Sequence, residues 1–134
     1  MAFQNVVLAK ENSVSGGVGL NTGITVAPGD LLTISARPDD TWSAGPGPRT
    51  SNANGLGNPT GQNFGVYTRN GFAFLYGSLV GSLDGGATFF AVGTRMEMTV
   101  LAPGRLSLYY WDANNADNSG SVTAIVVLYK GPVY

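Results

Sequence analysis

The alternation of apolar and polar side chains along the chain predicts short β-strands rather than helices. Residues 31–36 place Leu32, Ile34 and Ala36 on one face and polar side chains on the other. This repeat of two residues is typical of a strand with one buried face. No window has apolar residues that recur every 3.6 positions, so no helix is expected. The further stretches expected to form strands are residues 6–9, 23–26, 71–80, 88–92, 95–101, 106–111 and 122–129.

These stretches, joined by turns rich in Gly, Pro and Asn, predict an all-β fold. Residues 122–129 are apolar on both faces, which favours a central strand. Seven or eight short strands with such turns are typical of a β-sandwich of two antiparallel sheets, with a jelly-roll-like arrangement. The length of 134 residues fits a single domain over residues 1–134.

Residues 37–62 interrupt the strand pattern with a segment rich in Gly, Pro, Asn and Ser. The prolines exclude a regular helix or a central strand, so we expect a long structured loop, or two loops around a short edge segment. Such a loop is either a variable surface excursion or part of a functional site, and the sequence leaves both open. Its Trp42 could stack on a bound ligand or anchor the loop to the sandwich.

The charge balance argues against a nucleic-acid partner. The chain has 7 Lys and Arg against 8 Asp and Glu, a formal net charge of -1. It therefore lacks the basic surface that binds phosphate backbones. Charged residues make up 11% of the chain, against about 25% in an average domain, and such weak repulsion favours self-association.

Two chemically versatile residue types are missing: the chain contains no cysteine and no histidine. Disulfides and thiolate metal sites are therefore excluded, as are Ser-His and Cys-His catalytic pairs and most zinc sites.

The N-terminal sequence MAFQNV lacks the basic and long apolar segments of a Sec signal peptide. The longest apolar run, residues 124–128, is too short to span a bilayer. We therefore expect a soluble protein without membrane insertion, cytoplasmic as synthesised and exported, if at all, by a route other than Sec.

Five potential oxygen ligands are concentrated in one loop between two expected strands. They are Asp112, Asn114, Asn115, Asp117 and Asn118. Calcium takes six to eight oxygens from carboxylates, amides, backbone carbonyls and water, so this loop could bind it. The loop is not an EF-hand, because its sixth position is not the required glycine. The alternative is a polar hairpin loop, since the same residue types are common in turns for backbone reasons.

The chain resembles the PA-IL-type galactophilic lectins of bacteria around this loop. The resemblance rests on LSLYYWD at residues 106–112 and DNSGS at residues 117–121, with weaker matches at residues 28–34, 45–46 and 77–80. It implies a jelly-roll-like β-sandwich that assembles as a homotetramer. In this family a calcium ion is ligated directly by two hydroxyls of a terminal galactose, so calcium and galactose-like glycans are the cofactor and partner that the resemblance implies.

The resemblance also implies individual metal ligands. Asp112 matches the aspartate that opens the family's loop, and Asp117 and Asn118 match two consecutive asparagines that close it, so one amide has become a carboxylate. A mid-loop carbonyl ligand corresponds to Asn114. The present loop is about two residues shorter than the family's, so its neighbour Asn115 stays an alternative. A further carbonyl ligand is implied at Ala44, which precedes Gly45-Pro46.

For the sugar itself, the resemblance implies contacts from Asp112, Asn114 and Asp117. The family also uses a His and a Gln on its early loop, and this chain has no His. Alignment by spacing places Phe64 and Tyr67 near those positions, with Gln62 and Asn63 close by, so Gln62 and Tyr67 are the candidate replacements.

Together these features favour a calcium-dependent lectin over two other classes of protein. Vicinal hydroxyls can replace two waters on calcium and donate charge-assisted hydrogen bonds to the carboxylates that hold the ion. The main alternative is a structural or assembly subunit with a polar hairpin loop and no sugar site. An enzyme with Asp112 and Asp117 as an acid-base pair is not favoured, because both carboxylates are better explained as metal ligands.

Overall fold

The computed structural model describes residues 2–131, which form twelve strands and no helix. No helical segment of membrane-spanning length and apolarity therefore occurs within these residues. The strands are β1 (Ala2–Leu8), β2 (Leu20–Val26), β3 (Leu31–Ala36), β4 (Trp42–Ser43), β5 (Thr50–Ser51), β6 (Val66–Arg69), β7 (Phe72–Leu75), β8 (Leu79–Ser82), β9 (Phe90–Ala91), β10 (Arg95–Thr99), β11 (Gly104–Tyr110) and β12 (Ser119–Tyr129).

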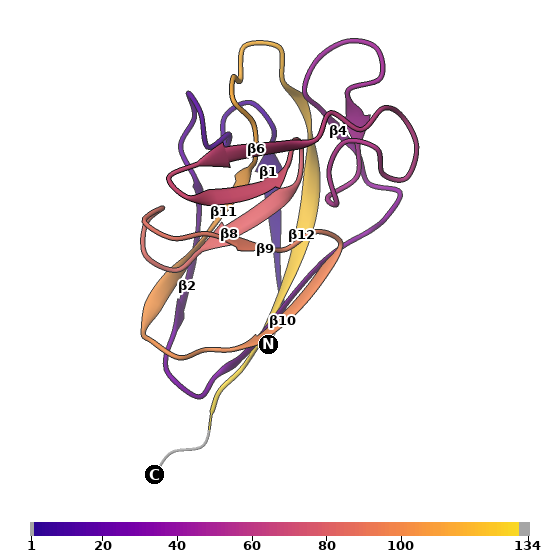
Figure 1. The fold of residues 1–134 in the computed structure, drawn as a ribbon. Helices are drawn as coiled ribbons and strands as arrows, with labels where there is room; N and C mark the ends of the chain where they lie inside the picture. The colour runs from indigo at the N-terminus through magenta and orange to yellow at the C-terminus, as the bar shows by residue number, and fades with distance from the viewer. Residues whose placement is uncertain (1, 132–134) are drawn as a thin grey trace.

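The strands build a β-sandwich of antiparallel sheets, as the alternation pattern predicts (Figure 1). One sheet has six strands in the order β10-β3-β12-β4-β5, with β1 paired to β12 as well. The second sheet has the order β2-β11-β8-β9, and β6 and β7 form a separate hairpin. The all-β sandwich expected from the sequence is thus confirmed. The strand number exceeds the expected seven or eight because several strands have only two residues and give no alternation signal.

β12 is the central strand of the first sheet, as its apolar character on both faces predicts. It pairs with β1, β3 and β4 along different parts of its length. Its inward side chains Val122, Ala124 and Val126 are fully buried against the second sheet. Each buried aliphatic side chain of this size contributes about 1.5–3 kcal/mol of hydrophobic stabilisation. The middle of β12 is therefore held firmly by the core.

β11 is buried on both faces, for two different reasons. Leu106, Leu108 and Tyr110 point into the core between the sheets. Tyr109 and Trp111, on the opposite face, are covered by a second apolar cluster that includes aromatic side chains of the β6–β7 hairpin. The Trp111 indole N–H donates a hydrogen bond to the Tyr67 carbonyl at 2.7 Å. This packing fixes the end of β11, directly before Asp112.

The structure corrects the expected strand over residues 71–80. It is divided into β7 and β8, with a turn around Gly77 between them. Gly77 has φ of 79°, and a Cβ there would lie 3.2 Å from both the Ser51 Oγ and the Tyr110 hydroxyl. A left-handed backbone at a crowded position requires glycine and interrupts the strand. The sequence pattern also failed to predict β6.

Residues 37–62 form loops around a short edge segment, one of the two expected arrangements. The edge segment is the hairpin of β4 and β5, which extends the first sheet through β12. Trp42 is 1% exposed and its indole N–H donates to the Gly77 carbonyl at 2.9 Å. Trp42 therefore anchors this segment to the sandwich.

Candidate functional site

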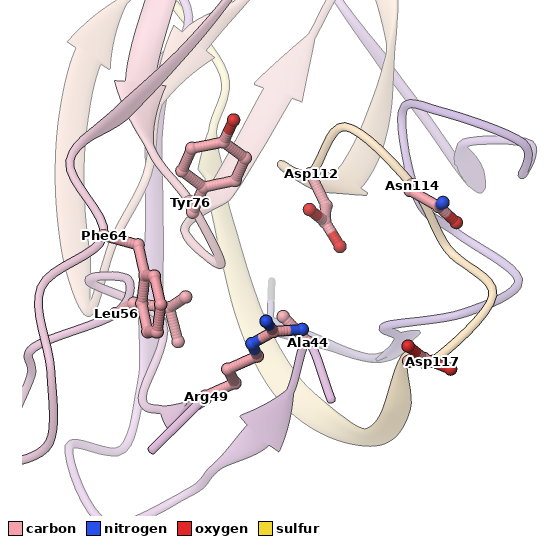
Figure 2. Close-up of a pocket in the computed structure, with 8 residues that line it drawn as sticks. All are labelled: Ala44, Arg49, Leu56, Phe64, Tyr76, Asp112, Asn114 and Asp117. Carbon is pink, nitrogen blue, oxygen red and sulfur yellow. The ribbon is translucent and has the colours of Figure 1, made fainter. Parts of the chain in front are cut away.

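A cavity of about 370 Å³ lies where β11 ends, β12 begins and the β4–β5 hairpin turns. Its volume falls within the range of about 300–1,000 Å³ that is usual for small-molecule sites. The cavity has an acidic wall and an opposite wall with one basic and several apolar side chains (Figure 2). The lining residues are Ala44, Arg49, Leu56, Phe64, Tyr76, Asp112, Asn114 and Asp117.

Asp112 is the buried acid of this cavity. It follows Trp111 at the end of β11 and is 7% exposed, and its carboxylate points into the cavity (Figure 2). Burial raises the pKa of the Asp112 carboxyl. The raise is opposed by a hydrogen bond from the Ala113 N–H, 2.8 Å from Oδ1, by Asn118 and the Asn114 backbone, and by the charge of Arg49. Asp112 thus holds a buried, incompletely compensated negative charge.

The loop after Asp112 is shaped by its own asparagines. The Asn114 Oδ1 accepts a hydrogen bond from the Ala116 N–H at 2.8 Å, and the Asn115 carbonyl accepts one from the Asn118 N–H at 3.1 Å. The Asn115 side chain donates to the Lys10 carbonyl at 3.0 Å, away from the cavity. The Asn114 carbonyl accepts no hydrogen bond from the described residues. Of the two alternatives for a mid-loop ligand, the bonding pattern therefore favours Asn114.

Asn118 carries an unsatisfied oxygen behind the loop. Its side chain is 5% exposed, and its Nδ2 donates to the Ala9 carbonyl at 2.8 Å, which fixes the amide plane. The Oδ1 is buried and has no hydrogen-bond partner among the described residues. An unpaired buried acceptor costs about 1–3 kcal/mol, so it calls for a partner that the protein itself does not supply.

The β4–β5 hairpin brings Ala44 to this loop. Ser43, the last residue of β4, pairs with Ser119 of β12, so Ala44 follows directly after the paired residues, on the side of Asn118. The Ala44 N–H donates to the Arg49 carbonyl across the hairpin at 2.8 Å, while the Ala44 carbonyl accepts no hydrogen bond from the described residues. The pairing of β4 with β12 thus brings Ala44 close to the loop that ends at Asn118, although the two are distant in sequence.

Arg49 also lines the cavity, where it could reach a ligand oxygen, although lone arginines of this kind are usually surface residues without such a role. Its guanidinium carbon lies 5.6 Å from the centre of the Phe64 ring. A Cβ on Gly45 would lie 3.3 Å from the Arg49 Cδ and 3.5 Å from the Asp117 Cβ, so both side chains pack close to this glycine. The cross-hairpin position of Arg49 opposite Ala44 follows from the GPGP turn, which is the signal that could have revealed it.

Two residues expected at the sugar do not line the cavity. Gln62 is exposed outside it. The Tyr67 hydroxyl lies 3.3 Å from the Ser15 Oγ and accepts a hydrogen bond from Arg69 at 3.4 Å. These hydrogen bonds, from Ser15 first and then Arg69, lower the pKa of Tyr67. The Tyr67 ring stacks on Tyr76 at 5.6 Å between centroids, so it supports the cavity wall from behind.

The donor set of the acidic wall consists of oxygens. Within residues 2–131 no group of three or more acidic side chains gathers, so a cation here would be held by the carboxylates of Asp112 and Asp117, the Asn118 amide and the carbonyls of Ala44 and Asn114. Two carboxylates with neutral oxygens are the hard ligands that calcium prefers. The unpaired Asn118 Oδ1 fits such an ion.

Comparison with known proteins shows a likeness to a solved lectin domain. No family model and no curated protein matches this chain. The chain is similar to the solved structure of the N-terminal domain of EclA, which is described as a PllA-like lectin. The two have 25% sequence identity and a TM-score of 0.68, and the match covers 95% of this chain and 96% of that chain. The fold is therefore similar over nearly the whole chain.

Proposed function

We propose that this protein is a calcium-dependent lectin that binds a terminal hexose through two vicinal hydroxyls. The observation that carries the proposal is the buried, unpaired Asn118 Oδ1 beside the cavity of Asp112 and Asp117. The likeness to a domain described as a PllA-like lectin supports the carbohydrate class of ligand.

The calcium ion would be held by residues from both sides of the cavity. Asp112 and Asp117 supply the charge, Asn118 supplies its amide oxygen, and Ala44 and Asn114 supply backbone carbonyls. When bound, calcium provides open coordination positions that sugar hydroxyls can occupy in place of water. Asp112 and Asp117 can also accept hydrogen bonds from those hydroxyls, which are strengthened by the negative charge.

The opposite wall suits the body of a sugar ring. Leu56, Phe64 and Tyr76 present apolar and aromatic surface to the same cavity. Aromatic rings pack well against apolar C–H faces, and a galactose-type hexose has one such face. Phe64, which alignment by spacing already places near the family's early-loop sugar contacts, and Tyr76 would therefore contact the sugar in place of Gln62 and Tyr67.

A titration with calcium followed by sugar tests the proposal. We expect isothermal titration calorimetry to show binding of methyl α-galactoside to the calcium-loaded protein and no binding after chelation. A glycan array with and without calcium then identifies the preferred hexose. Retention of the full sugar affinity in excess chelator would contradict a calcium-dependent site. Absence of any sugar binding with calcium present would instead favour a structural or assembly role.

A further inference from the structure

The cavity described above has one charged group that the proposed calcium site leaves without a partner. Its lining contains three charged residues, Asp112, Asp117 and Arg49. The two charges of a calcium ion balance the two carboxylates, so the positive charge of Arg49 would remain uncompensated. A neutral hexose does not change this balance, whereas a sugar with one negative charge does.

The hydrogen-bonding state of Arg49 points the same way. Its side chain forms no hydrogen bond and no ion pair with the residues that the structure describes. Arg37 and Arg95, by contrast, are paired with Asp39 and Glu97 on the surface. The guanidinium has five N–H donors in a planar fork that matches a carboxylate in bidentate fashion.

The Arg49 side chain is also held in position by its neighbours before any ligand binds. Its guanidinium lies over the Phe64 ring, and the absence of a side chain at Gly45 leaves room for Arg49 next to Asp117. Stacking of a guanidinium on an aromatic face restricts its motion while leaving the donors at its edge free. In Figure 2 the Arg49 side chain reaches into the cavity between the apolar wall and the two acids.

We propose that Arg49 selects acidic sugars, and that the preferred ligand of this cavity is a hexuronate whose carboxylate pairs with the Arg49 guanidinium while its ring hydroxyls reach the calcium. This inference rests on the proposed calcium-dependent lectin function and specifies its substrate class. Phe64 is the positioning residue for Arg49. A sulfated hexose offers the same charge with a different geometry, and the test below separates the two sources.

The test compares methyl α-galactoside, the corresponding galacturonate and galactose 6-sulfate by calorimetry on the calcium-loaded protein. We expect the galacturonate to bind about tenfold or more tightly than the neutral galactoside, the size of a charge-assisted hydrogen bond. Arg49→Gln should remove this preference, so that the acidic and the neutral galactoside bind this variant with about equal affinity. Arg49→Lys, which keeps the charge and loses the fork, should retain a smaller preference. Arg37→Gln makes the same change of net charge outside the cavity and should keep the full preference.

A second readout follows Arg49 itself. The Nε–H resonance of Arg49 should shift on titration with galacturonate and not with the neutral galactoside, and the melting temperature of each variant checks that it is folded. Equal affinity for the neutral and acidic galactosides would overturn the inference while leaving the lectin function in place. So would a preference that survives Arg49→Gln, because the carboxylate would then bind calcium instead. A stronger preference for the sulfate would also overturn the assignment to hexuronates. If no sugar binds with calcium present, the lectin function and this inference both fail.

Discussion

Two buried aspartates, Asp30 before β3 and Asp112 after β11, lie near the opposite ends of β12, and the hydrogen bonds around them differ. At the C-terminal end, the Asp30 side chain receives hydrogen bonds from the Ala27 N–H at 2.9 Å, the Gly131 N–H at 2.8 Å and the Lys130 ammonium at 2.9 Å. These bonds, first from Gly131 and then from Lys130, lower the pKa of Asp30 to about 2. At the N-terminal end, burial raises the pKa of Asp112.

The difference separates a structural carboxylate from a binding carboxylate. Both carboxylate oxygens of Asp30 accept hydrogen bonds from the protein, which link the turn before β3 to residues 130 and 131. Asp30 therefore requires no ligand. Asp112 has one close donor, the Ala113 N–H at 2.8 Å, and it lies in a cavity with Asn118 nearby, whose Oδ1 is unpaired. Perturbed and incompletely satisfied groups are concentrated at functional sites, because the missing partner is the ligand. The predictions below test this contrast, in order of their expected effect on calcium affinity.

The largest effect is expected for Asp112→Asn. Loss of an outer partner of a metal ligand already costs about 10- to 100-fold in affinity, and loss of a buried charged ligand should exceed that. Calorimetry should therefore show a calcium affinity at least about 100-fold weaker. The calcium-free variant should be as stable as the parent or more so, because a buried charge has been removed. A strong loss of calcium-free stability would instead make Asp112 a structural residue like Asp30.

Calcium itself should stabilise the folded chain. An ion that binds only the folded state at about 100 times its Kd contributes about 2.7 kcal/mol. The melting temperature should therefore rise by several degrees with calcium and return to its starting value after chelation. Asp30→Asn should keep this rise and Asp112→Asn should lose it. A rise of equal size in both variants would place the ion elsewhere.

A smaller effect is expected for Asp117→Asn. Asp117 is exposed, and the variant keeps an oxygen donor while losing one charge. Because ligand charge tunes calcium affinity, we expect a Kd about tenfold weaker, or ~1.4 kcal/mol. Glu97→Gln on β10 removes an exposed carboxylate outside the cavity and is the matched control. Equal effects of the two substitutions would mean that Asp117 is not a calcium ligand and acts only through its charge at long range.

No effect on calcium affinity is expected for Asp30→Asn, which should act on acid stability instead. A carboxyl whose pKa falls from 3.8 to about 2 on folding stabilises the protein above about pH 4. That contribution is lost as the pH falls from about 4 towards 2. Thermal melts between these values should show a steeper loss of stability in the parent than in Asp30→Asn. Parallel curves would show that Asp30 is not the responsible group.

The contrast between Asp30 and Asp112 also shows which of their interactions could be predicted from the sequence. The motif around Pro28-Gly29-Asp30 is common before strands and does not by itself reveal three donors, since two of them lie at the far end of the chain. The loop from Asp112 to Asn118 was predicted because its oxygens are neighbours in sequence. Local clustering is visible in a sequence, whereas pairing between distant segments depends on strand register.

The all-β sandwich, the central position of β12 and the polar loop that carries Asp112 and Asp117 could all be predicted from the amino-acid sequence. These follow from alternation of apolar side chains and from local concentration of one residue type. Three further features can be seen only in the folded structure: the Asn118 Oδ1 is unpaired, Arg49 lines the cavity, and Tyr67 does not. Each feature depends on a contact with a residue distant in sequence: Asn118 with Ala9, Arg49 with Phe64, and Tyr67 with Tyr76. Sheet pairing and core packing produce these contacts, and short-range sequence patterns do not encode them.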